Sequence, residues 1–144
     1  MLVPGGTISH SRFKIPIIIN EYSTCTISLN TLLAGLIQET SLIIWDQIPM
    51  QHKYYFKALN LTLNNIRGTT NNCSFGNIPI VLGGDFVQIL PVFRKGNCGA
   101  IVEACLQQSF LWSRSIILSL FENMRVREGE ANRKSANWLR QMSF

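Results

Sequence analysis

Short apolar runs that end abruptly in polar residues are the clearest pattern in this chain. One run covers residues 42–45 and is followed at once by Asp46, and a second covers residues 78–82 and is followed by two glycines and Asp85. Short apolar runs bounded by turn residues are typical of parallel strands buried on both faces. Ligands of open α/β sheets bind beyond the carboxyl ends of such strands, so we expect both carboxylates at one edge of a sheet.

Apolar residues at helical spacing occupy the intervals between these runs. They predict a helix that includes Leu29 to Ile37 and a second from about Gln51 to Ile66, and this alternation of helix and strand predicts an α/β fold. Residues 1–12 are polar and rich in turn formers and predict a loop. The remaining predicted elements are an edge strand or extended loop at Phe13–Ile19, a short helix within 97–110, a third strand at Ile116–Phe121 and a last helix at Ala131–Met142.

Composition narrows the class of protein. With 144 residues and 47% hydrophobic positions, the chain is long and apolar enough for one domain with its own core, and it is not a disordered tail. No apolar run approaches the ~18 residues of a membrane span. The net charge of +5 is compatible with a polyanionic partner, although the basic residues near the end also fit a solvated helix face. The four cysteines lack zinc-site spacing, and no signal-peptide pattern is visible, which predicts free thiols in a reducing compartment.

Asp46 and its neighbour carry the first candidate chemistry. A carboxylate at a strand end is suited to hold a Mg²⁺ ion that bridges the β- and γ-phosphates of a nucleotide, and the alternative is that Asp46 caps the following helix. The next residue is Gln47, a neutral amide that cannot accept a proton from an attacking water.

Two further polar residues follow predicted strands. Gln88 lies three residues after Asp85 and can hydrogen-bond a γ-phosphate or its attacking water, or simply the local backbone. Arg125 follows the predicted third strand, where a guanidinium could neutralise charge on a transferred phosphoryl group. The alternative for Arg125 is a surface ion pair with Glu122 or Glu128.

The polar stretch near the start is a candidate nucleic-acid contact. Thr7, Ser11 and Arg12 offer hydroxyls and a cation for phosphate, and the rings of His10 and Phe13 could stack on bases. An ordinary loop with Phe13 in the core explains the stretch equally well. A phosphate-binding Gly-x-x-x-x-Gly-Lys-Ser/Thr sequence does not occur in these residues.

Four stretches in order resemble the motifs of the Pif family of superfamily-one DNA helicases, in particular its plant and Helitron-type members. Residues 4–17 resemble the motif that follows the phosphate loop and helps to bind single-stranded DNA, and residues 42–50 resemble the Walker B motif. Residues 78–92 resemble the third motif, Gly-Gly-Asp-Phe-x-Gln-Ile-Leu-Pro-Val, and residues 123–125 resemble the fourth.

The resemblance implies a RecA-like P-loop NTPase motor domain with a mainly parallel sheet. Residues 1–144 would form a partial motor domain, with the first strand, the phosphate loop and the second motor domain outside this sequence. The family hydrolyses ATP with Mg²⁺, moves 5′ to 3′ on single-stranded DNA and unwinds duplexes. It also implies roles in DNA repair, recombination and telomere maintenance, and hence a nuclear or, alternatively, a mitochondrial location.

The resemblance also assigns roles to single residues. Asp46 would hold the metal, and Gln47 stands where the family has its catalytic Glu. Asp85, Gln88 and Arg125 would contact the nucleotide, Gln88 and Arg125 taking part in catalysis. The DNA contacts would be Thr7, His10, Arg12 and Phe13.

Three departures from the family pattern bear on activity. Besides Gln47, Val87 stands where close relatives usually have Arg, and the phosphate loop is missing from these residues. We therefore expect little or no ATPase activity from the chain by itself. The alternative is a non-catalytic, transposon-derived relic that binds nucleic acid weakly through the Thr7–Phe13 stretch and its basic end.

Overall fold

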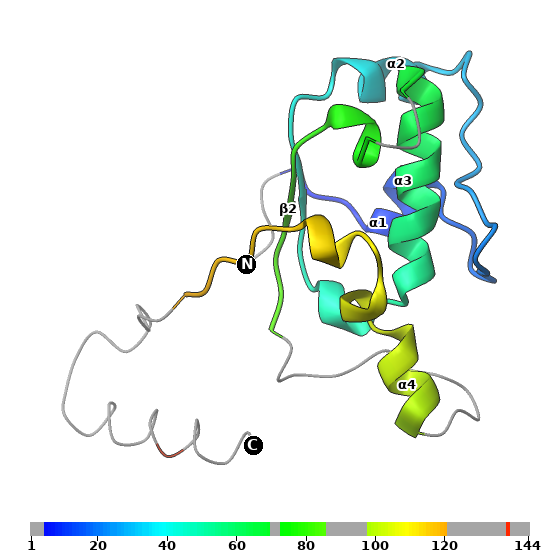
Figure 1. The fold of residues 1–144 in the computed structure, drawn as a ribbon. Helices are drawn as coiled ribbons and strands as arrows, with labels where there is room; N and C mark the ends of the chain where they lie inside the picture. Colours follow the sequence, from blue (N-terminus) through cyan, green and yellow to red (C-terminus); the bar gives the residue numbers. More distant parts are fainter. Residues whose placement is uncertain (1–4, 70–72, 86–97, 121–137, 139–144) are drawn as a thin grey trace. The chain divides into compact units, whose positions relative to one another are not determined.

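The computed structural model describes residues 5–69, 73–85, 98–120 and 138 (Figure 1). The chain divides into two compact units, Met1–Arg114 and Ser115–Phe144. The helices of the first unit are α1 (Ser9–Phe13), α2 (Leu32–Glu39), α3 (Lys53–Arg67) and α4 (Cys98–Ala104). Short 3₁₀ turns lie at Ile48–Met50, Phe75–Asn77, Leu106–Gln108 and Trp112–Arg114. No helix in the described part of the chain is long and apolar enough to cross a membrane.

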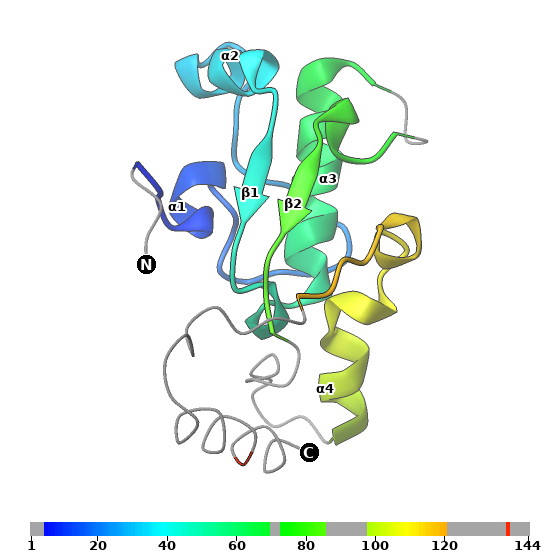
Figure 2. The same cartoon turned by 90° about the vertical axis from the view of Figure 1, so that its left-hand side faces the viewer.

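Two parallel strands form the sheet of the first unit. Strand β1 (Ile43–Trp45) pairs with β2 (Ile80–Leu82) in a register that sets Trp45 opposite Leu82. The connection between them runs through α3, which lies against one face of the sheet (Figure 2). Both predicted strands and the helix between them are thus confirmed, and the motif is a βαβ unit.

Only one face of this sheet is buried. Ile43 and Trp45 point into the core, but Ile44 between them is 63% exposed, and its register partner Val81 is 53% exposed. The sequence suggested strands buried on both faces, and the difference arises because α3 covers a single face of the sheet in the described residues.

Helix α3 is the centre of the core. It begins after His52, whose Nδ1 accepts a hydrogen bond from the Tyr54 N–H at 3.1 Å, and it ends at Gly68 in the left-handed conformation. Its inward face buries Phe56, Leu59 and Leu63 completely. The Trp45 ring packs on Phe56 with 4.7 Å between centroids, which joins the helix to the sheet.

Helix α2 confirms the predicted helix before β1 with a later start. It begins after Thr31, whose Oγ1 accepts a hydrogen bond from the Ala34 N–H at 3.3 Å. Ala34 and Ile37 are buried, whereas Leu32 is almost fully exposed.

Two predictions of local structure were wrong. Residues 9–13 form a helix, whereas a loop was predicted for residues 1–12 and an edge strand or extended loop from Phe13 onward. Contacts to the core stabilise this segment, which is too short to be helical alone. Residues 116–120 form no strand, and Ile116, Leu118 and Leu120 are exposed. An apolar run becomes a strand only when a neighbouring strand pairs with it. The last predicted helix lies outside the described residues except for Trp138.

Candidate functional site

Asp46 lies where the sequence placed it, directly after β1 at the carboxyl end of the sheet. Its side chain is exposed, and Oδ1 accepts a hydrogen bond from the Gln47 N–H at 2.8 Å. This bond fixes one oxygen of the carboxylate on the following backbone N–H. An oriented, exposed carboxylate at a strand end is suited to hold a hard cation.

Gly83 holds the turn that carries Asp46. Its N–H donates to the Trp45 carbonyl at 2.8 Å, and its own carbonyl accepts from the Ile48 N–H at 3.2 Å. The two hydrogen bonds therefore reach the residue before Asp46 and the second residue after it. A Cβ at Gly83 would lie 3.0 Å from the Asp46 Oδ1, so the two chains approach closely here.

Gln47 lies at the tip of this turn in a conformation that is rare for residues other than glycine. Its φ of 55° and ψ of 42° are left-handed, and a 3₁₀ turn containing buried Pro49 follows. The side chain is exposed. Its amide supplies hydrogen bonds but no base, so this position cannot take a proton from water.

The second strand end brings Asp85 to the same edge of the sheet. β2 ends at Leu82, and Gly83 and Gly84 lead to Asp85, which is exposed. A Cβ at Gly84 would lie only 2.4 Å from the Pro49 Cδ, so the two strand-end turns are packed against each other. The predicted common edge is confirmed for the two turns. Gln88 and Arg125 lie outside the described residues, as does Val87.

The described donors fit a magnesium ion that also binds phosphate, and they do not fit a metal held by protein alone. No group of three or more His, Cys, Asp or Glu side chains gathers among the described residues. Magnesium is usually held by one or two carboxylates, with waters and substrate phosphates completing the octahedron. A single exposed Asp46 at the strand end matches this pattern.

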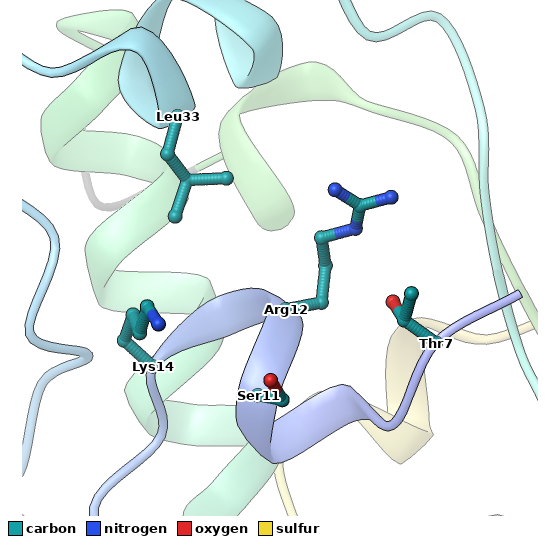
Figure 3. A pocket seen from close by; sticks show the side chains of 5 residues that line it. All are labelled: Thr7, Ser11, Arg12, Lys14 and Leu33. Carbon is teal, nitrogen blue, oxygen red and sulfur yellow. The ribbon is translucent and has the colours of Figure 1, made fainter.

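A basic pocket lies beside α1 (Figure 3). It measures about 220 Å³, and two cations, two hydroxyls and one apolar side chain line it: Arg12, Lys14, Thr7, Ser11 and Leu33. In Figure 3 the Arg12 side chain extends away from α1, with Thr7 beside it. None of these described lining residues is acidic. Guanidinium, ammonium and hydroxyl groups are the usual partners of a nucleic-acid phosphate.

The opposite side of α1 packs on the core. Ser9 Oγ accepts a hydrogen bond from Gln51 Nε2 at 3.4 Å, and the His10 ring meets the Tyr55 ring edge-on at 4.6 Å. Phe13 packs on Trp45 with 6.0 Å between ring centroids. The rings of His10 and Phe13 are both half-buried. Phe13 therefore packs against the core, which is one of the two positions that the sequence allowed for it. Base stacking by His10 or Phe13 stays a prediction.

Besides Ser11, the pocket is lined by two residues that were not among the predicted DNA contacts, Lys14 and Leu33. Lys14 ends α1 in a left-handed conformation with φ of 50°, which turns the chain at the pocket. The sequence offered one signal for Lys14, because this basic residue directly follows Phe13, a predicted DNA contact. Leu33 comes from α2, and nothing in the local sequence connects it with α1.

Comparison with known proteins gives a consistent picture. Residues 1–143 match the family model described as PIF1-like helicase. The "ATP-dependent DNA helicase Pif1" of Psychrobacter sp. (strain PRwf-1) is 31% identical over 112 residues, which are 78% of this chain and 17% of that protein. The "ATP-dependent DNA helicase PIF4" of Trypanosoma brucei brucei is 25% identical over 92 residues, covering 60% of this chain and 11% of that protein.

Solved structures share the fold. A Pif1 helicase from Bacteroides in complex with ADP-AlF3 and single-stranded DNA matches with a TM-score of 0.76 and 22% identity, over 97% of this chain and 34% of that one. Pif1 helicase from Candida albicans matches with a TM-score of 0.69 and 23% identity, over 96% of this chain and 30% of that one. These matches confirm the predicted RecA-like α/β fold, and the chain spans about a third of the solved proteins.

Proposed function

The chain belongs to the PIF1-like helicase family, and from this premise we propose that it carries two contacts of an ATP-dependent DNA helicase. One is the contact of Asp46 to a magnesium-bound nucleotide, and the other is the contact of the α1 pocket to single-stranded DNA. The single observation that carries the proposal is the chemistry of this pocket, in which Arg12, Lys14 and two hydroxyls surround one space.

At the nucleotide contact, this chain supplies an oriented carboxylate. Asp46 is held by the Gln47 N–H and by the hydrogen bonds of Gly83 on either side of it. Bound Mg²⁺ would neutralise charge on phosphate oxygens. Asp85, on the neighbouring strand end, is the second carboxylate at this edge, and we propose that Gln88 and Arg125 add nucleotide contacts from further along the chain.

At the DNA contact, the pocket supplies charge without base recognition. Arg12 and Lys14 would neutralise phosphates, and the Thr7 and Ser11 hydroxyls would hydrogen-bond to phosphate oxygens. A solved relative is a complex with single-stranded DNA, which supports this assignment. Phosphate contacts position a strand and carry no sequence information, so we expect binding that tolerates any base sequence.

The wider activity is proposed from the family resemblance alone. It comprises 5′ to 3′ movement, duplex unwinding, and roles in DNA repair, recombination and telomere maintenance. The plant and Helitron-type subgroup and a nuclear location, with the mitochondrion as the alternative, belong to the same proposal.

Substitutions in the pocket test the DNA contact. We expect Arg12→Ala to weaken binding of a fluorescein-labelled oligo(dT) roughly tenfold, because a hydrogen bond to a charged group contributes about 1.5 kcal/mol. The slope of log affinity against log salt should also fall by about 0.7, as one phosphate contact is lost. The measurement is fluorescence anisotropy at several salt concentrations.

Lys57→Ala is the matched control, because it removes one positive charge from α3, where Lys57 pairs with Glu21 at 4.0 Å. This variant should bind like the wild type. Equal losses for Arg12→Ala and Lys57→Ala would show that net charge, not the pocket, causes binding.

Gln47 favours a second function, which is nucleic-acid binding without hydrolysis. Because Gln47 cannot act as a base and these residues contain no phosphate-loop sequence, we expect the 144-residue chain to release no phosphate from ATP, with or without oligo(dT). A phosphate-release assay checks this. DNA-stimulated turnover that disappears in Asp46→Ala would contradict the expectation.

A further inference from the structure

The backbone conformation at Gly83 does not require glycine. Positive φ angles occur at Gly5, Gly68 and Gly76 among the described glycines, and Gly83 is not one of them. Any L-amino acid can adopt its conformation, so what limits a larger residue here is the space beside it.

The atoms that lie nearest to the space beside Gly83 belong to Asp46. The three nearest atoms to a Cβ at this position would be Oδ1, Cα and Cγ of Asp46, at 3.0, 3.8 and 3.8 Å. A contact of 3.0 Å is shorter than a comfortable carbon–oxygen separation, so one of the two groups must move.

The backbone of Gly83 is harder to move than the Asp46 carboxylate. Its N–H is bound to the Trp45 carbonyl and its carbonyl to the Ile48 N–H, so it is attached to the chain on both sides of Asp46. The exposed Asp46 carboxylate can rotate, but rotation would strain or break its 2.8 Å hydrogen bond from the Gln47 N–H.

We therefore infer that Gly83 is a positioning residue that keeps the Asp46 carboxylate in the orientation in which it holds a divalent cation. The inference rests on the metal role proposed for Asp46. Gly83 makes no contact with the cation itself and acts only through the space that it leaves.

Neighbouring Gly84 provides a contrast within the same turn. A Cβ there would lie 2.4 Å from Cδ and 2.8 Å from Cγ of Pro49, a buried and rigid ring. Substitution of Gly84 therefore disturbs packing and not the carboxylate. Gly35 in α2, with nothing within 4 Å of a Cβ, is a glycine at which alanine fits freely.

The first test is a double-mutant cycle in urea unfolding with Gly83→Ala and Asp46→Ala. Gly83→Ala should lower the unfolding midpoint of the wild type and should have a smaller effect in the Asp46→Ala background, where the contacted oxygen is gone. Gly84→Ala should lower the midpoint equally in both backgrounds, and Gly35→Ala should lower it in neither. An equal effect of Gly83→Ala in both backgrounds, including failure to fold in both, would overturn the inference.

The second test reads the cation directly, with Mn²⁺ as a paramagnetic probe for the NMR signal of the Gln47 amide. Mn²⁺ should broaden this signal in the wild type and not in Asp46→Ala, and Gly83→Ala should need a several-fold higher Mn²⁺ concentration. Gly84→Ala, measured where it is folded, should keep the wild-type profile.

The outcomes separate the two proposals. An unchanged Mn²⁺ profile in Gly83→Ala would overturn the inference while leaving the metal role of Asp46 intact. A wild-type protein without broadening at Gln47 would overturn the metal role, and with it the purpose assigned to Gly83, even if the unfolding cycle shows coupling.

Discussion

Asn64 shows how one buried polar side chain fastens a loop to a helix. It is 2% exposed in the last turn of α3, and its Oδ1 accepts hydrogen bonds from the Gly76 N–H at 2.7 Å and the Thr69 hydroxyl at 3.0 Å. Its Nδ2 donates to the Cys73 carbonyl at 3.0 Å. Gly76 itself is left-handed, and a Cβ there would lie 2.7 Å from the Leu63 carbonyl oxygen, so the loop has little freedom to find other partners.

Replacing Asn64 with alanine should therefore cost roughly 2–3 kcal/mol of unfolding free energy, because a buried N–H and a carbonyl would lose their partners. Urea denaturation measures the change. Asn65→Ala is the control, since Asn65 is the next residue of α3 and is exposed. Similar midpoints for the two variants would contradict the proposed role.

At the scale of residues, the sequence predicted where a side chain lies better than which groups it hydrogen-bonds to. Asp46 was placed correctly because a carboxylate that follows an apolar strand must lie at the sheet edge. Thr62 is buried and accepts a hydrogen bond at 2.9 Å from the N–H of Cys25, which is distant in the sequence. The bonds of Asn64 to the 73–77 loop were not predictable, because a buried asparagine on a helix has the same local pattern as an exposed one.

At the scale of elements, α3 begins with a cap that depends on protonation. His52 Nδ1 accepts from the Tyr54 N–H only when the imidazole is neutral at that nitrogen. Burial, followed by the positive charge of Lys53, lowers the pKa of His52. Lys53 in turn pairs with Glu103 of α4 at 3.8 Å.

This cap predicts a stability that depends on pH. An unfolded histidine has a pKa of about 6.5, and the folded pKa of His52 lies lower, so between the two values the unfolded chain binds more protons. The unfolding free energy should therefore fall as the pH drops through about 6.5 and level off below the folded pKa. Urea midpoints between about pH 7.5 and 5 measure this, and His52→Asn, which keeps a capping side chain, should reduce the slope. Equal slopes in the two proteins would rule out His52 as the source.

Elements with a clear apolar period were the predictable ones. The patterns of β1, β2, α2 and α3 each had one interpretation, and the structure contains all four. Helix α1 was missed because five residues between turn formers have no helical signal, and its stability comes from Tyr55 and Trp45, which are distant in sequence. The strand predicted at 116–121 had the right composition, but composition does not provide a pairing partner.

At the scale of the whole molecule, the chain corresponds to a small part of its longer relatives. It spans 17% of the bacterial relative and about a third of the solved structures that it matches. The βαβ unit brings the two strand-end turns together, and α1 separates the pocket on one side from the core on the other. The family could be predicted from the order of its motifs, whereas the pocket could not, because Leu33 reaches it only through the packing of α2 near α1.

The contact between Gly84 and Pro49 has a consequence for the substitutions that this chain can accept. A side chain at Gly84 would occupy the space of the Pro49 ring, so a larger residue at the first position becomes acceptable only after the second has changed. The two residues lie 35 positions apart in the sequence, yet a substitution at one strand end limits which residues fit at the other.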